Sequence, residues 1–387
     1  MDPKDMKPEL SLKEKERRWS LVKKKMAQEG LAAIVIYAND GHKRDVACRY
    51  FTNVWFFATC EHMLLIPAEG EPVLLTTGDE FGTFARILSW IPAENIIDST
   101  NKGADLAQQL IRLGLQKERI GVDNPGGWPV RDYLAFKELC PDTELVDVTR
   151  WLAEMRAQKS QEELKLIEEA VRIGELAHRA FLANLKPGLK EEEVVAKVEE
   201  VVKAHGIDRR LWLMVNNPEI PWPWPAGETV IRKTNPVVFA PEFARMRGYA
   251  FQAIRTYCWE EPKGELKRMF ELWGELRRIV PQEFRPGRRM SEVAEKIANL
   301  VNDWGYEYYN MGHGIGLHFF EESSISPKPL FPDWTLMPNE VYEFHPMIRN
   351  KGARGPVAWG GDMYFIGEDT TRWMTTFLPG LPEMIPG

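Results

Sequence analysis

A spaced motif in the second half of the sequence occurs twice. Lys186-Pro187-Gly188 precedes Glu193-Val194 and Gly206, and Arg285-Pro286-Gly287 precedes Glu292-Val293 and Gly305, with a constant offset of 99 residues. In each copy a helical pattern leads into the Pro-Gly turn, and an amphipathic pattern follows and ends at glycine, as helices commonly do. The duplication predicts two similar α+β halves related by an approximate two-fold axis.

The first part of the chain has a different pattern. Apolar runs at residues 32–37, 63–67, 72–76 and 120–123 are typical of buried strands, and helical patterns lie between them, for example at 103–113 and 129–140. This alternation predicts an α/β domain. Ser160-Gln161-Glu162-Glu163 is a capping box that opens a long helix. We therefore place one domain at residues 1–155 and a second at 156–387.

Charge and composition exclude several classes of partner. The formal net charge is −7 and no basic block occurs, which argues against binding to nucleic acid or to an anionic membrane. No apolar run is long enough to cross a bilayer, and the start of the sequence lacks the pattern of a cleaved signal. The four cysteines have no CxxC spacing, which favours reduced thiols. We expect a cytoplasmic protein.

The segment Gly312-His313-Gly314-Ile315-Gly316 resembles the histidine loop of the aminopeptidase P, prolidase and creatinase family. Three further segments support this resemblance: residues 156–160 resemble the interdomain hinge, and residues 248–256 and 339–346 resemble two strands of the site. The resemblance implies an internally duplicated α+β "pita-bread" C-terminal domain, preceded by an α/β creatinase/prolidase-type N-terminal domain. It also implies an active site in the concavity of a curved sheet.

The peptidases of this family hold two metal ions with one histidine and four carboxylates. His313 matches the histidine, but the four carboxylate positions carry Pro241, Gln252, His345 and Gly361. Two hard cations need roughly four negative charges, and an amide supplies none. We therefore expect neither a metal nor another cofactor, as in creatinase, a metal-free member of the family.

Four side chains are candidates for acid–base chemistry. Glycines on both sides of His313 bring the backbone close to a ligand, and imidazole titrates near neutral pH, so His313 is the candidate base. His345 follows Glu343 by two residues on a predicted strand, so both point to one face. Glu321, on the loop after His313, is the candidate acid. In the alternative interpretation, His345 only fills the place of a glutamate and Glu343 is an exposed strand residue.

Aromatic residues stand where the family has imidazoles. Trp224 replaces the histidine of a Pro-His loop, and Phe320 replaces the histidine seven residues after His313. Aromatic faces near a few carboxylates favour a small methylated cation. Alternatively, these rings pack a former metal cavity shut. The candidate substrate-binding residues are Trp222, Trp224, Glu242, Gln252, Phe320 and Trp359.

Three hypotheses for function follow. The first is a metal-independent, creatinase-like hydrolase or lyase that acts on a C–N or related bond of a small, methylated, cationic substrate. The second is a catalytically inactive binding relative. The third is a mononuclear metallohydrolase or Xaa-Pro-type peptidase. The partner expected in each case is a small molecule, and the resemblance implies a homodimer.

Overall fold

The structure is a computed structural model that describes residues 10–39, 46–54, 60–216, 223–245, 248–318, 320–321, 323–328, 333–352 and 357–385. The chain divides into two compact units, Met1–Arg156 and Ala157–Gly387. Each unit has its own sheets and helices and is described separately. Within the described ranges, no helix combines the length and the apolar character needed to cross a membrane.

The first unit is built around a mixed sheet of six strands in the order β4-β3-β2-β1-β5-β6. Strand β1 lies inside the sheet, where it pairs parallel with β5 and antiparallel with β2. The strands are β1 (Ala33–Asn39), β2 (Glu61–Pro67), β3 (Val73–Thr76), β4 (Ile96–Asp98), β5 (Arg119–Asp123) and β6 (Glu144–Asp147). Four of them overlap the predicted apolar runs; β4 and β6, with only two apolar residues each, were not predicted.

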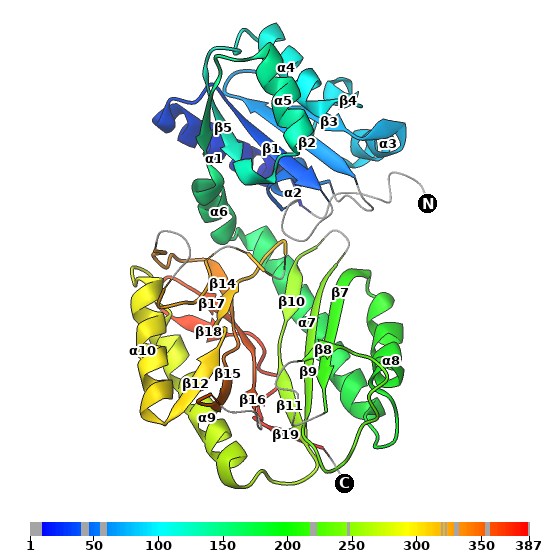
Figure 1. Ribbon diagram of the computed structural model, residues 1–387, viewed down its shortest axis with the longest axis vertical. Helices are drawn as coiled ribbons and strands as arrows, with labels where there is room; N and C mark the ends of the chain where they lie inside the picture. The colour runs from blue at the N-terminus through cyan, green and yellow to red at the C-terminus, as the bar shows by residue number, and fades with distance from the viewer. Residues whose placement is uncertain are drawn as a thin grey trace. The chain divides into compact units, whose positions relative to one another are not determined.

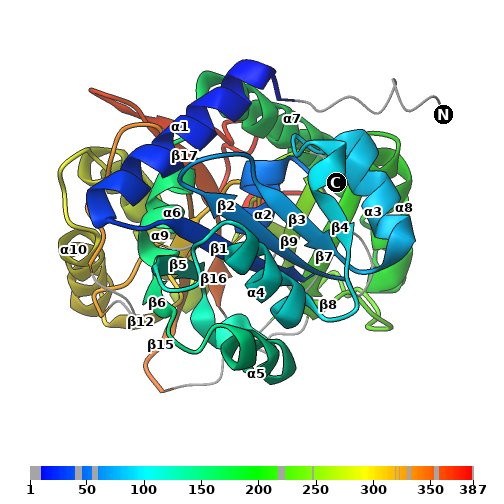
Figure 2. The same cartoon turned by 90° about the horizontal axis from the view of Figure 1, so that it is seen from above.

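Helices cover this sheet because β1 is apolar on both faces. Helices α4 and α5 lie on one face and α1 on the other (Figure 2). Val35 and Leu65 pack with Leu106, Leu110 and Phe136 in the core beneath α4 and α5. The helices are α1 (Leu12–Glu29), α2 (Val46–Thr52), α3 (Gly78–Leu88), α4 (Lys102–Arg112), α5 (Val130–Leu139) and α6 (Thr149–Ala157).

The first half of the second unit begins with α7 (Gln161–Asn184), and its predicted capping box is present. Helix α8 (Glu191–Lys203) packs on α7, and both lie beside a sheet in the order β19-β11-β9-β7-β8, with β10 paired to β9 (Figure 1). Its strands are β7 (Ile207–Val215), β8 (Trp224–Pro225), β9 (Val237–Arg245), β10 (Ala250–Gln252), β11 (Arg255–Cys258) and β19 (Glu383–Met384).

The second half repeats the plan with α9 (Gly264–Glu283) and α10 (Met290–Asp303) outside two smaller sheets (Figure 1). One sheet has the order β12-β15-β16 and the other β13-β14-β17-β18. The strands are β12 (Tyr306–Tyr309), β13 (Gly312–Gly314), β14 (Glu340–Phe344), β15 (Met347–Asn350), β16 (Ala358–Trp359), β17 (Asp362–Ile366) and β18 (Thr371–Trp373).

The two halves repeat each other down to individual hydrogen bonds. Gly188 and Gly287 both have positive φ, at 90° and 84°, where glycine is favoured. The Gly188 N–H donates to Ile231 O at 2.9 Å, and the Gly287 N–H donates to Leu336 O at 2.8 Å. Reciprocal backbone hydrogen bonds between Ile254 and Gly361 join the two halves. The predicted duplication is therefore confirmed.

Candidate active site

A small pocket lies where strands of the two halves meet. Its volume is about 230 Å³, below the roughly 300–1,000 Å³ that is common for ligand sites. The first half contributes residues of β7, β9 and β10, and the second half contributes the region from β12 to β16. The lining residues are Leu213, Pro223, Glu242, Gln252, Tyr309, Asn310, His313, Phe320, His345, Met347 and Trp359.

His313 occupies the middle of β13, opposite Glu343 of β14. Gly312 has a φ of 129°, and a side chain there would overlap Glu343 O, so the glycine permits close pairing of these strands. The imidazole is buried, and its Nδ1 lies 3.0 Å from Gly314 O. A carbonyl partner places the proton on Nδ1 and the lone pair on Nε2. This tautomer is the one that can accept a proton through Nε2.

Two rings pack against His313. The Phe320 ring lies 4.3 Å away between centroids at 33°, and the His345 ring lies 5.1 Å away, edge to face. Both ring nitrogens of His345 are buried and lack a hydrogen-bond partner in the part of the chain that the structure describes. Burial lowers the pKa of His345 to about 4. His345 is therefore neutral at physiological pH.

Glu242 faces Gln252 across the β9–β10 pair. Gln252 Nε2 donates to Glu242 Oε1 at 3.2 Å, while Gln252 Oε1 is buried without a partner among the described residues. Burial raises the pKa of Glu242 from its usual 4.5 to about 7. This carboxyl group therefore exchanges its proton near neutral pH, a range suited to acid–base catalysis.

Glu343 lies beneath the pocket and is completely buried. Neither carboxyl oxygen has a hydrogen-bond partner within the described ranges. Burial is the main cause that raises the pKa of Glu343 well above its usual range, which favours the uncharged form of this carboxyl group. A Cβ on Gly361 would overlap Glu343 Oε1, which shows that this carboxyl group fills the space beside the glycine.

Asp362, next to Gly361, belongs to a buried ionic network behind the pocket. Its carboxylate binds Arg255 and accepts hydrogen bonds from Arg277 Nε at 2.9 Å and Thr375 Oγ1 at 2.9 Å. Arg255 and Arg277 hold the pKa of Asp362 below its usual value despite burial. Arg255 Nη1 also donates to Gly361 O at 2.7 Å, so the network fixes the backbone beneath Glu343.

Three predicted site residues do not line the pocket: Glu343, which lies beneath it, Glu321 and Trp224. Glu321 is buried, and its Oε2 lies 2.8 Å from Lys159 Nζ, so the carboxylate is bound in an ion pair. Trp224 is 62% exposed at the edge strand β8, where its neighbour Pro223 lines the pocket instead. Trp222 lies outside the described residues. The pocket is lined by the other six predicted residues: Glu242, Gln252, His313, Phe320, His345 and Trp359.

Sequence reasoning missed several lining residues. Leu213 and Met347 are ordinary apolar strand residues, and nothing in the local sequence distinguishes them. Tyr309 and Asn310 precede the His313 loop, and Asn310 has a positive φ of 45°. Its Oδ1 accepts from Gly312 N at 3.2 Å and so shapes this turn. An asparagine three residues before the histidine was the available signal.

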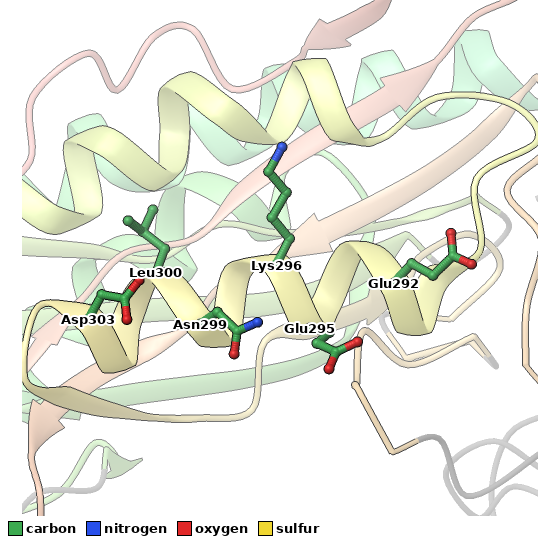
Figure 3. Close-up of a pocket in the computed structure, with 6 residues that line it drawn as sticks. All are labelled: Glu292, Glu295, Lys296, Asn299, Leu300 and Asp303. Atoms are coloured by element: carbon green, nitrogen blue, oxygen red, sulfur yellow. The ribbon is translucent and has the colours of Figure 1, made fainter.

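A second hollow, along α10, is not a comparable site (Figure 3). The six described residues that line it all come from this one helix, and five are exposed polar or charged residues of its solvent face. Lys296 donates to Glu283 Oε1 at 2.6 Å. The arrangement is that of a solvated amphipathic helix.

Comparison with known proteins identifies the family. The model of metallopeptidase family M24 matches residues 165–369, and that of the creatinase/prolidase N-terminal domain matches residues 18–158. The chain belongs to metallopeptidase family M24. The family and the pita-bread fold class predicted from the sequence are confirmed.

Individual relatives in the family are distant. The chain is 26% identical over 201 residues to an uncharacterised peptidase of Bacillus subtilis, which covers 51% of this chain and 57% of the relative. It is 27% identical over 180 residues to a Xaa-Pro dipeptidase of Pyrococcus horikoshii, covering 45% and 51%. These matches span about half the length of the relatives, so their activities do not transfer directly.

Solved structures agree over nearly the whole chain. The prolidase from Pyrococcus horikoshii has a TM-score of 0.78 at 20% identity, covering 93% of this chain and 98% of that one. The dipeptidase PepE from Mycobacterium ulcerans has a TM-score of 0.81 at 19% identity, covering 98% and 100%. At this identity the likeness shows the fold alone.

Proposed function

We propose that this chain hydrolyses an amide-type C–N bond in a small, uncharged or cationic substrate by acid–base catalysis in the pocket around His313. Membership of family M24 and relatives named Xaa-Pro dipeptidases support a hydrolase of C–N bonds. The observation that carries the proposal is the meeting of His313, neutral His345 and a Glu242 with a pKa of about 7 in one small pocket.

In the proposed reaction, His313 Nε2 accepts a proton from water as the water oxygen adds to the carbonyl carbon. The C–N bond then breaks, and protonated Glu242 transfers its proton to the departing nitrogen. Neutral His345 donates a hydrogen bond to the oxygen on which negative charge develops. The proton on His313 returns through solvent to Glu242. Each positioned acid or base contributes about 10²–10⁴-fold in rate.

The lining indicates which substrates suit the pocket. No lysine or arginine is among the described residues that line it, so the free carboxylate of a dipeptide has no counter-ion there. Tyr309, Phe320 and Trp359 present aromatic rings instead. An ammonium group over such a ring gains about 0.5–2 kcal/mol. These features favour an uncharged or methylated cationic amide over a dipeptide.

The two-metal centre of a metallopeptidase fits these residues poorly. Within the described ranges no three His, Cys, Asp or Glu side chains are grouped so that they could hold a metal ion. Burial raises the pKa of Glu343 and favours its uncharged form, and Asp362 is bound by two arginines. The remaining donors therefore supply far less negative charge than two divalent cations require. We derive no step through a metal.

A hydrolase with a single transition metal, or a Xaa-Pro-type peptidase, is the second candidate, and membership of metallopeptidase family M24 with relatives named Xaa-Pro dipeptidases supports it more directly than a metal-independent reaction. The observation that favours it is the pair of unpartnered ring nitrogens on His345, whose ring lies 5.1 Å from that of His313. Imidazole is a good ligand for zinc and iron. The third candidate is a catalytically inactive relative that binds a small molecule without turnover.

A turnover assay on chelator-treated protein separates these functions. Product release is measured by mass spectrometry for Xaa-Pro dipeptides, methylated cationic amides and uncharged amides, with and without added zinc, iron or manganese. We expect metal-independent turnover of a cationic or uncharged amide, abolished by His313→Ala and reduced by Glu242→Gln. Lys197→Met, an exposed change on α8, is the matched control.

The alternative outcomes are distinct. Turnover that requires added metal favours the second candidate, and binding without turnover favours an inactive relative. Turnover that survives in His313→Ala contradicts the assigned base.

We also propose a homodimer in the cytoplasm, from likeness to the family and from the absence of a membrane-spanning helix among the described residues. Sedimentation equilibrium at micromolar concentration tests the dimer. A single species at the monomer mass of 44.6 kDa contradicts it.

A further inference from the structure

A larger hollow lies in the second unit, and none of its described lining residues lines the pocket around His313. Its volume is about 650 Å³, within the roughly 300–1,000 Å³ common for small-molecule sites. The end of α7 and the turn after it form one wall, and Trp259 and Ile385 form another. Nothing in the acid–base site uses these residues.

Backbone hydrogen bonds hold these walls in place. Leu185 ends α7 and donates to Phe181 O at 2.9 Å, and the Gly188 N–H donates to Ile231 O at 2.9 Å. The second bond brings the segment containing Lys233 to the turn after α7. On the other side, Ile385 N donates to Cys258 O at 2.8 Å, next to Trp259. The hollow is therefore part of the folded framework.

The chemistry of the lining is amphiphilic. Leu182, Leu185, Ile385 and the half-buried Trp259 supply an apolar floor. Every charged side chain among the described lining residues is cationic, although the whole chain has a net charge of −7. Those side chains are Arg179, Lys186 and Lys233.

Local acidic residues neutralise this charge only in part. Arg179 binds Glu175 of the same helix at 2.6 and 2.9 Å. Glu260 and Glu261 follow Trp259 in the sequence but do not line the hollow. Lys186 also lies at the negative end of the α7 dipole, where a cation is stabilising. Stabilisation of the helix end accounts for Lys186, but it does not explain why Lys233 and the Trp259 ring lie in the same hollow.

We propose that this hollow binds a small aromatic carboxylate. The flat ring lies against Trp259 and the leucines, and the carboxylate lies between Lys186 and Lys233. An apolar ring adds the burial that exposed lysines alone cannot provide, because an exposed ion pair contributes only about 0–1 kcal/mol. The proposal is independent of the hydrolase function.

Calorimetric titration with naphthalene carboxylate and its uncharged carboxamide tests this site. We expect the carboxylate to bind at one site and the carboxamide to bind about tenfold more weakly, because the amide lacks the charge that two exposed lysines recognise. Lys186→Met/Lys233→Met should weaken the carboxylate by about tenfold as well. Trp259→Leu should weaken both compounds.

Lys197→Met is the matched control, since it removes an exposed cation elsewhere on the same unit. Equal affinity for the two compounds overturns the proposal, as does equal weakening by the control. Binding that is lost in His313→Ala but kept in the double lysine variant assigns the ligand to the other pocket and likewise overturns it. None of these outcomes depends on whether the chain hydrolyses a substrate.

Discussion

Replacing Lys159 by methionine tests how the loop after His313 is held. Lys159 Nζ lies 2.8 Å from Glu321 Oε2, and the two side chains are only 2% and 6% exposed. Glu321 Oε1 accepts from Leu317 N at 2.9 Å, and Glu321 N donates to Gly314 O at 2.9 Å. The carboxylate therefore ties Lys159 to Leu317, and the backbone of Glu321 pairs with Gly314. Methionine keeps the apolar length of lysine and removes its charge.

The distance between Lys159 and Glu321 and the burial of both groups determine how much stability Lys159→Met removes. At 2.8 Å the attraction is about 6 kcal/mol for an effective dielectric constant of about 20. Burial of both ions offsets much of this, so the pair itself stabilises the fold little. Lys159→Met removes the attraction but leaves Glu321 buried, and such a change costs about 3–5 kcal/mol. Lys159→Met/Glu321→Gln removes both charges, and glutamine can still accept from Leu317, so we expect most of the loss to be recovered.

Thermal and urea unfolding followed by tryptophan fluorescence measure this difference, because nine of the 14 tryptophans follow residue 200. For a unit of this size, 3 kcal/mol lowers the Tm by about 6–12 °C. Lys197→Met, which removes an exposed ion pair, should stay within about 0.5 kcal/mol of the parent. The reasoning is refuted if Lys159→Met costs less than about 1 kcal/mol, or if the double variant is no more stable than the single one.

Three further changes have defined outcomes. Gly361→Ala should cost about 1–3 kcal/mol in urea unfolding, because its Cβ overlaps Glu343 Oε1, and adding Glu343→Ala should restore part of this; an unchanged midpoint would contradict the overlap. Asp362→Asn should cost about 3–5 kcal/mol, because Arg255 and Arg277 are then buried without their carboxylate, and a loss under 1 kcal/mol would count against the network. Because the folded state raises the pKa of Glu242 from 4.5 to about 7, its contribution to stability is complete below pH 4.5 and is lost as the pH rises to about 7. Glu242→Gln should remove this dependence of the unfolding free energy on pH. Identical pH profiles of unfolding for the parent and the variant would contradict the raised pKa of Glu242.

The duplication and the histidine loop could be predicted because their signals are local. A Pro-Gly turn, a helix and a terminal glycine recur at fixed spacing, and each element needs only its own residues to form. His313 is likewise marked by the glycines around it, and the close approach of Gly312 to the backbone oxygen of Glu343 explains why one of them is required. Patterns of this kind depend on backbone geometry, which short stretches of sequence determine.

The position of each carboxyl group could not be predicted in the same way. Glu321 follows the histidine loop closely, but its ion-pair partner Lys159 lies 162 residues earlier in the chain. Glu343 lies on β14 and His345 follows just after the end of that strand, yet Glu343 lies beneath the pocket because Gly361 leaves room for it. Trp224 lies on a short edge strand, whose outward face no local spacing reveals. These outcomes depend on contacts between distant segments.

Each of the carboxyl groups of Glu242, Glu343 and Asp362 around the pocket is either held towards its uncharged form or paired with arginine. The pKa of Glu343 lies well above its usual range and that of Glu242 is about 7, whereas Asp362 is neutralised by Arg255 and Arg277. With His345 also neutral, the interior is arranged to bury polar groups with little net charge. A carboxylate restored at Gly361 alone would meet the Glu343 carboxyl group instead of a cation. A metal centre therefore requires coordinated changes at several of these positions, and a single substitution at Gly361 should destabilise the fold without creating one.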